Sequence, residues 1–271
     1  GDNAGGALTT GGENIAIGSA ALDAEDTGNR SVAIGFEALT AQNNDANNYN
    51  VAVGYVAGKA VTSGIRNNFF GAESGEALTT GNDNIAIGYQ TLTSETAGNR
   101  TVAIGNNALD AQNSSTDTNM YNVGVGYAAG GSVTTGVQNT LIGGLAGDAL
   151  TDADFNVAMG YAALGADTLG SRSIAIGYAA LDAQNFTTAT DSYNTAVGFE
   201  AGGAVTTGTR NVLIGGLAGD ASTTGSRNHV IGYNALGQDT KGERATALGY
   251  GALQSQNFTT ATENYNVALG Y

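Results

Sequence analysis

A glycine that recurs at intervals of 17, 19 or 21 residues constrains this chain more than any other feature. It stands at Gly1, Gly18, Gly35, Gly54, Gly71, Gly88, Gly105, Gly126, Gly143, Gly160, Gly177, Gly198, Gly215, Gly232, Gly249 and Gly270. A strict period of this length is typical of stacked coils of one repeated unit. We therefore expect residues 1–271 to form a single continuous array of about 15 rungs, taken from a longer protein.

A second period of 72 residues is superimposed on the first. Gly54, Gly126, Gly198 and Gly270 are each 72 residues apart, so three 17-residue units and one 21-residue unit form a super-repeat. Counting each repeat glycine as position 0, position +4 confirms this grouping. Two rungs with glycine there, such as Gly58 and Gly75, are followed by two rungs with leucine.

The residues around the repeat glycine predict β-structure. Position −4 is Asn in eleven of the fifteen complete cases, positions −3 and −1 are mostly Val or Ile, and position −2 is usually Ala. This alternation from −3 to +1 predicts a strand of about five residues with one bulky and one small face. Positions +3 and +4 predict a second short strand, and the frequent Gly at +10 predicts a turn with positive φ. The fold class is all-β, a parallel β-solenoid.

All seven arginines lie at position −5, where each longer unit has tyrosine instead. This Arg/Tyr column comprises Arg30, Tyr49, Arg66, Arg100, Tyr121, Arg172, Tyr193, Arg210, Arg227, Arg244 and Tyr265. Because stacked rungs lie about 4.8 Å apart, neighbouring Arg and Tyr side chains should form cation–π contacts. Three consecutive arginines, Arg210, Arg227 and Arg244, require interleaved carboxylates, which we expect from a neighbouring chain. The alternative is a merely solvated column.

Charge and composition exclude several classes of function. The chain has 24 acidic and nine basic residues and a net charge of −15, which argues against a nucleic-acid partner. No apolar run is long enough for a membrane-spanning helix. The chain has no cysteine, so disulfides and thiolate metal sites are excluded, and it has no proline, which suits uninterrupted hydrogen-bonded ladders.

Catalytic and metal-binding patterns are missing. His229, the only histidine, stands at position −3 and is interpreted as a strand residue. Acidic residues such as Glu25 do not recur at every repeat, so solvated turns are a better interpretation than a Ca²⁺ site. We therefore expect no catalytic residue, cofactor or metal, and no enzymatic activity.

One chain by itself leaves the small Ala/Gly face of the predicted strand uncovered. Few large apolar side chains occur in each rung, and their burial is weak support against the entropy cost of ordering the backbone. Association of identical chains about a common axis solves both problems, and a homotrimer is the preferred arrangement.

Segments such as 30–39 (RSVAIGFEAL) and 84–92 (NIAIGYQTL) carry a family resemblance. They resemble the head repeats of trimeric autotransporter adhesins and related bacteriophage tail-fibre or surface-fibre repeats, and the similarity covers essentially the whole chain. The resemblance implies a homotrimer of left-handed parallel β-rolls outside the cell, on a cell or virion surface. The 17-residue rungs and regular 21-residue insertions depart from the adhesin pattern and favour the fibre group.

The longer units are the candidate binding features. Their loops lie near 41–50, 111–122, 183–194 and 255–266 and should protrude from one edge every fourth rung. Amide and aromatic side chains suit a sugar ring, so the candidate surface-binding residues are Gln112, Asn113, Gln184, Asn185, Phe186, Tyr193, Gln256, Asn257, Phe258 and Tyr265. The alternative is that the loops only thicken the fibre or lock chains together.

Three functions remain open from sequence. The first is a structural or adhesive extracellular fibre shaft, with other copies of the chain as its main partner. The second is a module that binds a cell-surface glycan or receptor through the loops. The third, least favoured, is an ice-binding solenoid, suggested by the Thr column at +8.

Overall fold

The computed structural model describes all residues from 1 to 271 and consists of two compact units, Gly1–Val137 and Gln138–Tyr271. Both contain only strands, turns and loops, and no helix is present that could cross a membrane. Each unit is a parallel β-solenoid in which one rung contributes one short strand, with about 15 turns in the two units together. The predicted all-β parallel β-solenoid is confirmed.

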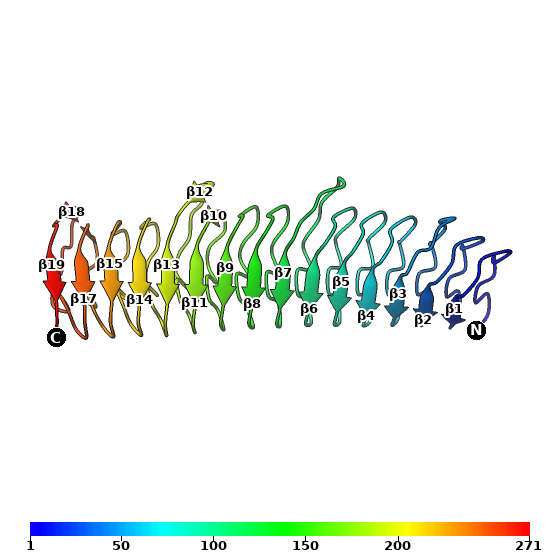
Figure 1. Cartoon of the computed structure of the whole chain (residues 1–271), viewed down its shortest axis with the longest axis horizontal. Coiled ribbons are helices and arrows are strands. Elements are labelled where there is room, and N and C mark those ends of the chain that lie inside the picture. The colour runs from blue at the N-terminus through cyan, green and yellow to red at the C-terminus, as the bar shows by residue number, and fades with distance from the viewer. The chain divides into compact units, whose positions relative to one another are not determined.

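The strands of each unit lie side by side in chain order (Figure 1). The first unit contains β1 (Ile15–Ile17), β2 (Val32–Ile34), β3 (Val51–Val53), β4 (Asn68–Phe70), β5 (Ile85–Ile87), β6 (Val102–Ile104) and β7 (Val123–Val125). The second contains β8 (Thr140–Ile142), β9 (Val157–Met159), β11 (Ile174–Ile176), β13 (Thr195–Val197), β14 (Val212–Ile214), β15 (His229–Ile231), β17 (Thr246–Leu248) and β19 (Val267–Leu269). Each strand has three residues, positions −3 to −1, rather than five.

Neighbouring strands pair in full register whatever the length of the unit between them. Ile15 pairs with Val32 across 17 residues, and Val102 pairs with Val123 across 21. The additional residues therefore leave the strand ladder undisturbed and are placed in the loops. Figure 1 shows two of these loops standing above their neighbours, one between β6 and β7 and one that carries β12 (Thr190–Asp191).

The repeat glycine is required by its conformation and by a close backbone contact. Gly35 has a φ of 140°, and a Cβ added there would lie 2.1 Å from the carbonyl oxygen of Gly54. The glycines at +10 are required only by a close backbone contact. A Cβ on Gly64 would lie 2.4 Å from the carbonyl oxygen of Gly81, and no glycine of this column has a positive φ. The prediction of positive φ at +10 is wrong, because close stacking of the rungs already excludes a side chain.

The two faces of the strand are oriented opposite to the expectation. The small residue at −2 points into the rung, and Ala33, Ala86 and Ala158 are fully buried. The bulky residues at −3 and −1 point outward, so that Ile15 and Ile17 are 48% and 57% exposed. The expectation of an uncovered Ala/Gly face is wrong, because the narrow interior of a rung accepts the small side chains and leaves the bulky ones outside.

No second strand follows the repeat glycine. Positions +2 and +4 instead adopt left-handed conformations, as in Glu37 (φ 51°) and Leu39 (φ 49°), and this turn directs the +4 side chain inward. Alternating left-handed residues cannot form a β-ladder, which needs extended backbone. The leucines at +4 therefore provide core volume rather than a second sheet.

The 72-residue super-repeat is a pattern of complementary core volumes. Phe69, Leu141 and Leu213 replace the usual alanine at −2 once per super-repeat, and all three are buried. Where the large residue stands at −2, glycine stands at +4. A Cβ on Gly75 would lie 2.3 Å from the Phe69 ring, and one on Gly219 would lie 2.9 Å from Leu213. The two-glycine, two-leucine alternation therefore keeps the interior filled without overlap.

Buried asparagines at −4 connect most rungs to their neighbours. The Asn67 side chain accepts a hydrogen bond from the backbone N–H of Asn84 (3.0 Å) and donates one to the Gly81 carbonyl (2.8 Å). The Thr column at +8 adds a second ladder, in which the Thr79 hydroxyl donates to the Thr96 carbonyl (2.8 Å). Both columns satisfy backbone or side-chain polar groups that three-residue strands cannot pair by themselves.

Candidate functional site

Each long loop returns to the solenoid beside the rung before it. In the second unit this return forms two small parallel pairs, β10 (Gly170–Ser171) with β12 and β16 (Gly242–Glu243) with β18 (Thr262–Glu263). In the first unit the same positions form single parallel bridges, Asn29 with Asn47 and Asn99 with Asn119. The loops are thus fixed at their returning ends as well as at the strand.

A buried carboxylate at +7 of the preceding rung holds the beginning of each loop. The four acids are Glu25, Glu95, Asp167 and Asp239, each at most 1% exposed. Glu95 Oε1 accepts hydrogen bonds from the N–H groups of Gly98 (2.7 Å) and Ser114 (3.0 Å), and its Oε2 accepts one from the Gln112 amide (2.9 Å). A buried charge needs such partners to be tolerated. The interpretation of Glu25 as a solvated turn residue is wrong.

A sequence pattern that repeats with the long units marks these anchors. An acid at +7 occurs in the rung before every long unit, and a glutamine at +7 follows in the long unit itself. The identity of the acid and the loop residue that it binds both differ between the two units. Glutamates in the first unit bond to the N–H of Asn44 or Ser114, whereas aspartates in the second bond to that of Phe186 or Phe258.

The candidate surface-binding residues separate into buried and exposed groups. Gln112, Gln184 and Phe186 are buried, and Gln256 and Phe258 are half-buried. The Gln184 amide is bonded to Asp167 and to Ser173, so it is part of the anchor and does not face a ligand. The exposed members are Asn113, Asn185, Asn257, Tyr193 and Tyr265. Each of these three asparagines accepts a hydrogen bond from a threonine hydroxyl of the preceding rung.

The Arg/Tyr column forms the predicted cation–π contacts at every long unit. The guanidinium carbon lies 5.6 Å from the ring centre in the pairs Arg30–Tyr49 and Arg100–Tyr121, 6.0 Å in Arg172–Tyr193 and 5.4 Å in Arg244–Tyr265. The prediction of stacked Arg and Tyr side chains is confirmed. All these residues have a positive φ, between 49° and 64°.

The carboxylates beside two of the three consecutive arginines belong to the same chain. Arg227 lies 3.7 Å from Glu243, and Arg244 lies 2.8 Å from Glu263. For Arg227 and Arg244, the expectation that a neighbouring chain supplies the carboxylate is wrong, because Glu243 and Glu263 of the same chain lie within reach. No carboxylate of the same chain forms an ion pair with Arg210, so the expectation stays a prediction there. Such exposed ion pairs contribute little to stability.

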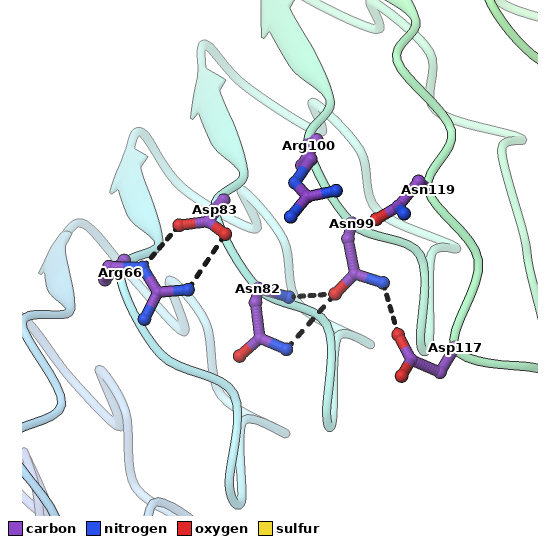
Figure 2. A pocket seen from close by; sticks show the side chains of 7 residues that line it. All are labelled: Arg66, Asn82, Asp83, Asn99, Arg100, Asp117 and Asn119. Atoms are coloured by element: carbon purple, nitrogen blue, oxygen red, sulfur yellow. Dashed lines mark hydrogen bonds and ion pairs between the residues drawn. The ribbon is translucent and has the colours of Figure 1, made fainter.

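A polar pocket lies beside the loop before β7, and we call it the first loop pocket. Its volume is about 320 Å³, and it is lined by Arg66, Asn82, Asp83, Asn99, Arg100, Asp117 and Asn119 (Figure 2). Arg66 and Asp83 form a two-pronged ion pair, and this hydrogen bonding lowers the pKa of Asp83. Asn99 is buried, and its side-chain amide donates a hydrogen bond to Asp117 (2.6 Å). Figure 2 shows the Arg100 guanidinium apart from both of these bonded groups.

A second loop pocket occupies the corresponding place in the second unit, beside the loop that carries β12. Its volume is about 430 Å³, and it is lined by Asp152, Asp154, Phe155, Ser171, Arg172, Ala189, Thr190 and Asp191. Here Arg172 is ion-paired with Asp191 and also lies 4.9 Å from the centre of the Phe155 ring. The two pockets therefore share their position and differ in their charge pairing.

The outward face of the strands is a surface without charged residues. In the rungs from β1 to β19, positions −3, −1 and +1 contain none of the 24 acidic or nine basic residues of the chain. Position +1 carries rows of stacked exposed rings, with centres 5.7 Å apart in Tyr161–Tyr178 and 5.3 Å apart in Tyr178–Phe199. We call these three outward columns the sheet face.

Comparison with known proteins gives no match. No family model, no curated protein and no solved structure matches the chain significantly. The features that bear on function are therefore the anchored loops, the loop pockets and the sheet face.

Proposed function

We propose that this chain is a non-catalytic shaft module of an extracellular fibre, assembled as a homotrimer of left-handed β-solenoids. The observation that carries the proposal is the sheet face, which is mostly apolar, rich in exposed aromatic rings and without Asp, Glu, Lys or Arg in a chain of net charge −15. Large exposed apolar surfaces mark interaction sites. A second copy is the natural occupant, because its rungs have the same spacing and its sheet face is likewise uncharged.

The resemblance to adhesin heads and tail-fibre repeats supports three chains and an extracellular location. Association would also remove rows of Ile, Val and Tyr side chains from water, and full burial of one Ile or Val side chain contributes about 1.5–3 kcal/mol. The carboxylates would remain on the other surfaces, where a net charge far from zero keeps an assembled fibre soluble.

The test is the mass of the protein in solution. Light scattering should give the mass of three chains for the wild type and a smaller mass for the double variant Ile174→Lys, Tyr178→Lys, which puts charge on the sheet face. The matched control is Thr187→Lys, Thr188→Lys on the exposed loop of the same rung, which should stay trimeric. A monomeric wild type, or a sheet-face variant of unchanged mass, would contradict the proposal.

A further inference from the structure

Among the four arginines that immediately precede a long unit, Arg100 differs in having no carboxylate partner. Arg30 is paired with Glu13, Arg172 with Asp191 and Arg244 with Glu263. The Arg100 guanidinium donates only to the Tyr121 hydroxyl (2.8 Å), and its carbon lies over the Tyr121 ring. A guanidinium has five N–H donors in a planar fork, so most of those on Arg100 remain available.

The two acids of the first loop pocket have other partners and do not form an ion pair with Arg100. Asp83 is bound through both of its oxygens to Arg66, and Asp117 accepts from the buried Asn99 amide. The position occupied by Asp191 in the second loop pocket is occupied by the neutral Asn119 in the first. The pocket thus combines one available cation with several amides, and Tyr121 holds the cation in place.

We propose that the first loop pocket binds a carboxylate-bearing sugar residue, with its carboxylate on Arg100 and its hydroxyl groups on Asn82, Asn119 and Asp117. Planar two-pronged recognition of a carboxylate is the characteristic use of a guanidinium. A singly charged carboxylate suits the site better than a doubly charged phosphate, because Asp83 and Asp117 also line the pocket. The almost wholly polar lining suits hydroxyl groups, and about 320 Å³ is within the range of small-ligand sites.

This binding site goes beyond the fibre function and does not depend on it. The pocket is formed within one unit of one chain, so a monomeric protein would bind as a trimer does, with one site per chain. Mass measurements therefore test the fibre, and sugar binding tests the pocket.

The experiment is a titration of the full chain with N-acetylneuraminic acid and with glucuronic acid, followed by NMR, with glucose as the neutral probe. We expect binding of at least one acidic sugar, perturbation of resonances from the first loop pocket, and no comparable effect of glucose. Preference for the first acid would indicate a sialylated glycan as the source, and preference for the second a uronic-acid polysaccharide. Binding of neither acid, or equal binding of glucose, would overturn the proposal.

Three variants refine the test. Arg100→Gln should weaken binding at least about tenfold, as expected for loss of a hydrogen bond to a charged group, and Gln138 shows that glutamine is accepted in this column with a φ of 57°. Arg172→Gln, in the second loop pocket, should leave binding unchanged. Asp191→Asn should release Arg172 and give a second site. Unchanged thermal melting would show that each variant is folded, and unchanged affinity of Arg100→Gln would overturn the proposal.

Discussion

At the scale of single residues, the polar side chains buried in the rungs act as connectors. The asparagines at −4 and the acids at +7 each bind backbone groups of a neighbouring rung or loop. A three-residue strand pairs few of its own backbone groups, and an unpaired buried group is costly. Polar residues are therefore as necessary to this interior as apolar ones.

We expect Glu95→Gln to lower the free energy of unfolding by about 1–3 kcal/mol, the usual cost of an unsatisfied buried polar group. The new NH₂ group would face either the Gln112 amide or the N–H groups of the loop, all of which are donors. Denaturant unfolding measures the change. The control is Glu13→Gln, where the carboxylate is exposed and should contribute less than about 1 kcal/mol. Equal effects of the two substitutions would contradict the anchoring role.

At the scale of the elements, each strand and turn is fitted to the rungs on either side. The repeat glycine allows neighbouring backbones to approach closely. A large side chain at −2 is accompanied by glycine at +4, so the total side-chain volume inside a rung stays similar. Protein interiors are close-packed, so a change in one rung must be matched in that rung or the next. The 72-residue super-repeat reflects this matching of side-chain volumes at positions −2 and +4.

Two adjacent glycines provide a direct test of the backbone contact. Gly143→Ala should destabilise the protein by more than about 4 kcal/mol, the range reserved for severe steric and backbone effects, because φ is 131° and the new Cβ would lie 2.5 Å from the Gly160 carbonyl oxygen. Gly144→Ala, whose Cβ would lie 3.6 Å from the nearest atom, should be almost neutral. Thermal unfolding compares them, and similar melting temperatures would count against the argument.

The complementary side-chain volumes at −2 and +4 can be tested by moving the large side chain from −2 to +4 in one rung. Leu213→Ala should cost about 2–5 kcal/mol through the cavity it leaves. Adding Gly219→Leu should recover much of this loss, since the leucines of this column adopt the same left-handed φ of about 50–60°. A double-mutant cycle from denaturant unfolding measures the coupling. Additive effects of the two substitutions would show that the residues do not share the space.

At the scale of the whole molecule, the net charge of −15 is kept away from the sheet face. Part of it lies at +5, where aspartates alternate with glycines in successive rungs from Asp110 to Gly237. Burial raises the pKa of Asp182, and burial followed by the charge of Glu200 raises that of Asp220. These carboxylates therefore weaken the folded state when they are ionised.

The sign of the pH dependence follows from these raised pKa values. Between the unfolded pKa, near 3.9, and the raised folded pKa, the native state binds more protons, so stability falls as pH rises through that window. Asp182→Asn should therefore stabilise the protein at pH 7, by up to about 0.5 kcal/mol as for a surface substitution, and should have no effect near pH 3. The exposed Asp45→Asn is the control. Melting temperatures at the two pH values measure the difference, and a loss of stability at pH 7 would contradict it.

The sequence by itself determined the repeat, the parallel stacking, the position of the strand and the Arg/Tyr contacts, because each depends on spacing along the chain. Tertiary structure decided which face of the strand is inside, since alternation defines two faces and only the width of the rung shows which one fits. It also revealed that Gln112 and Gln184 are buried beside Glu95 and Asp167, a pairing across 17 residues that exists only after the rungs stack. Likewise, only the stacked rungs show that Arg100 has no carboxylate partner, since its neighbours come from other rungs.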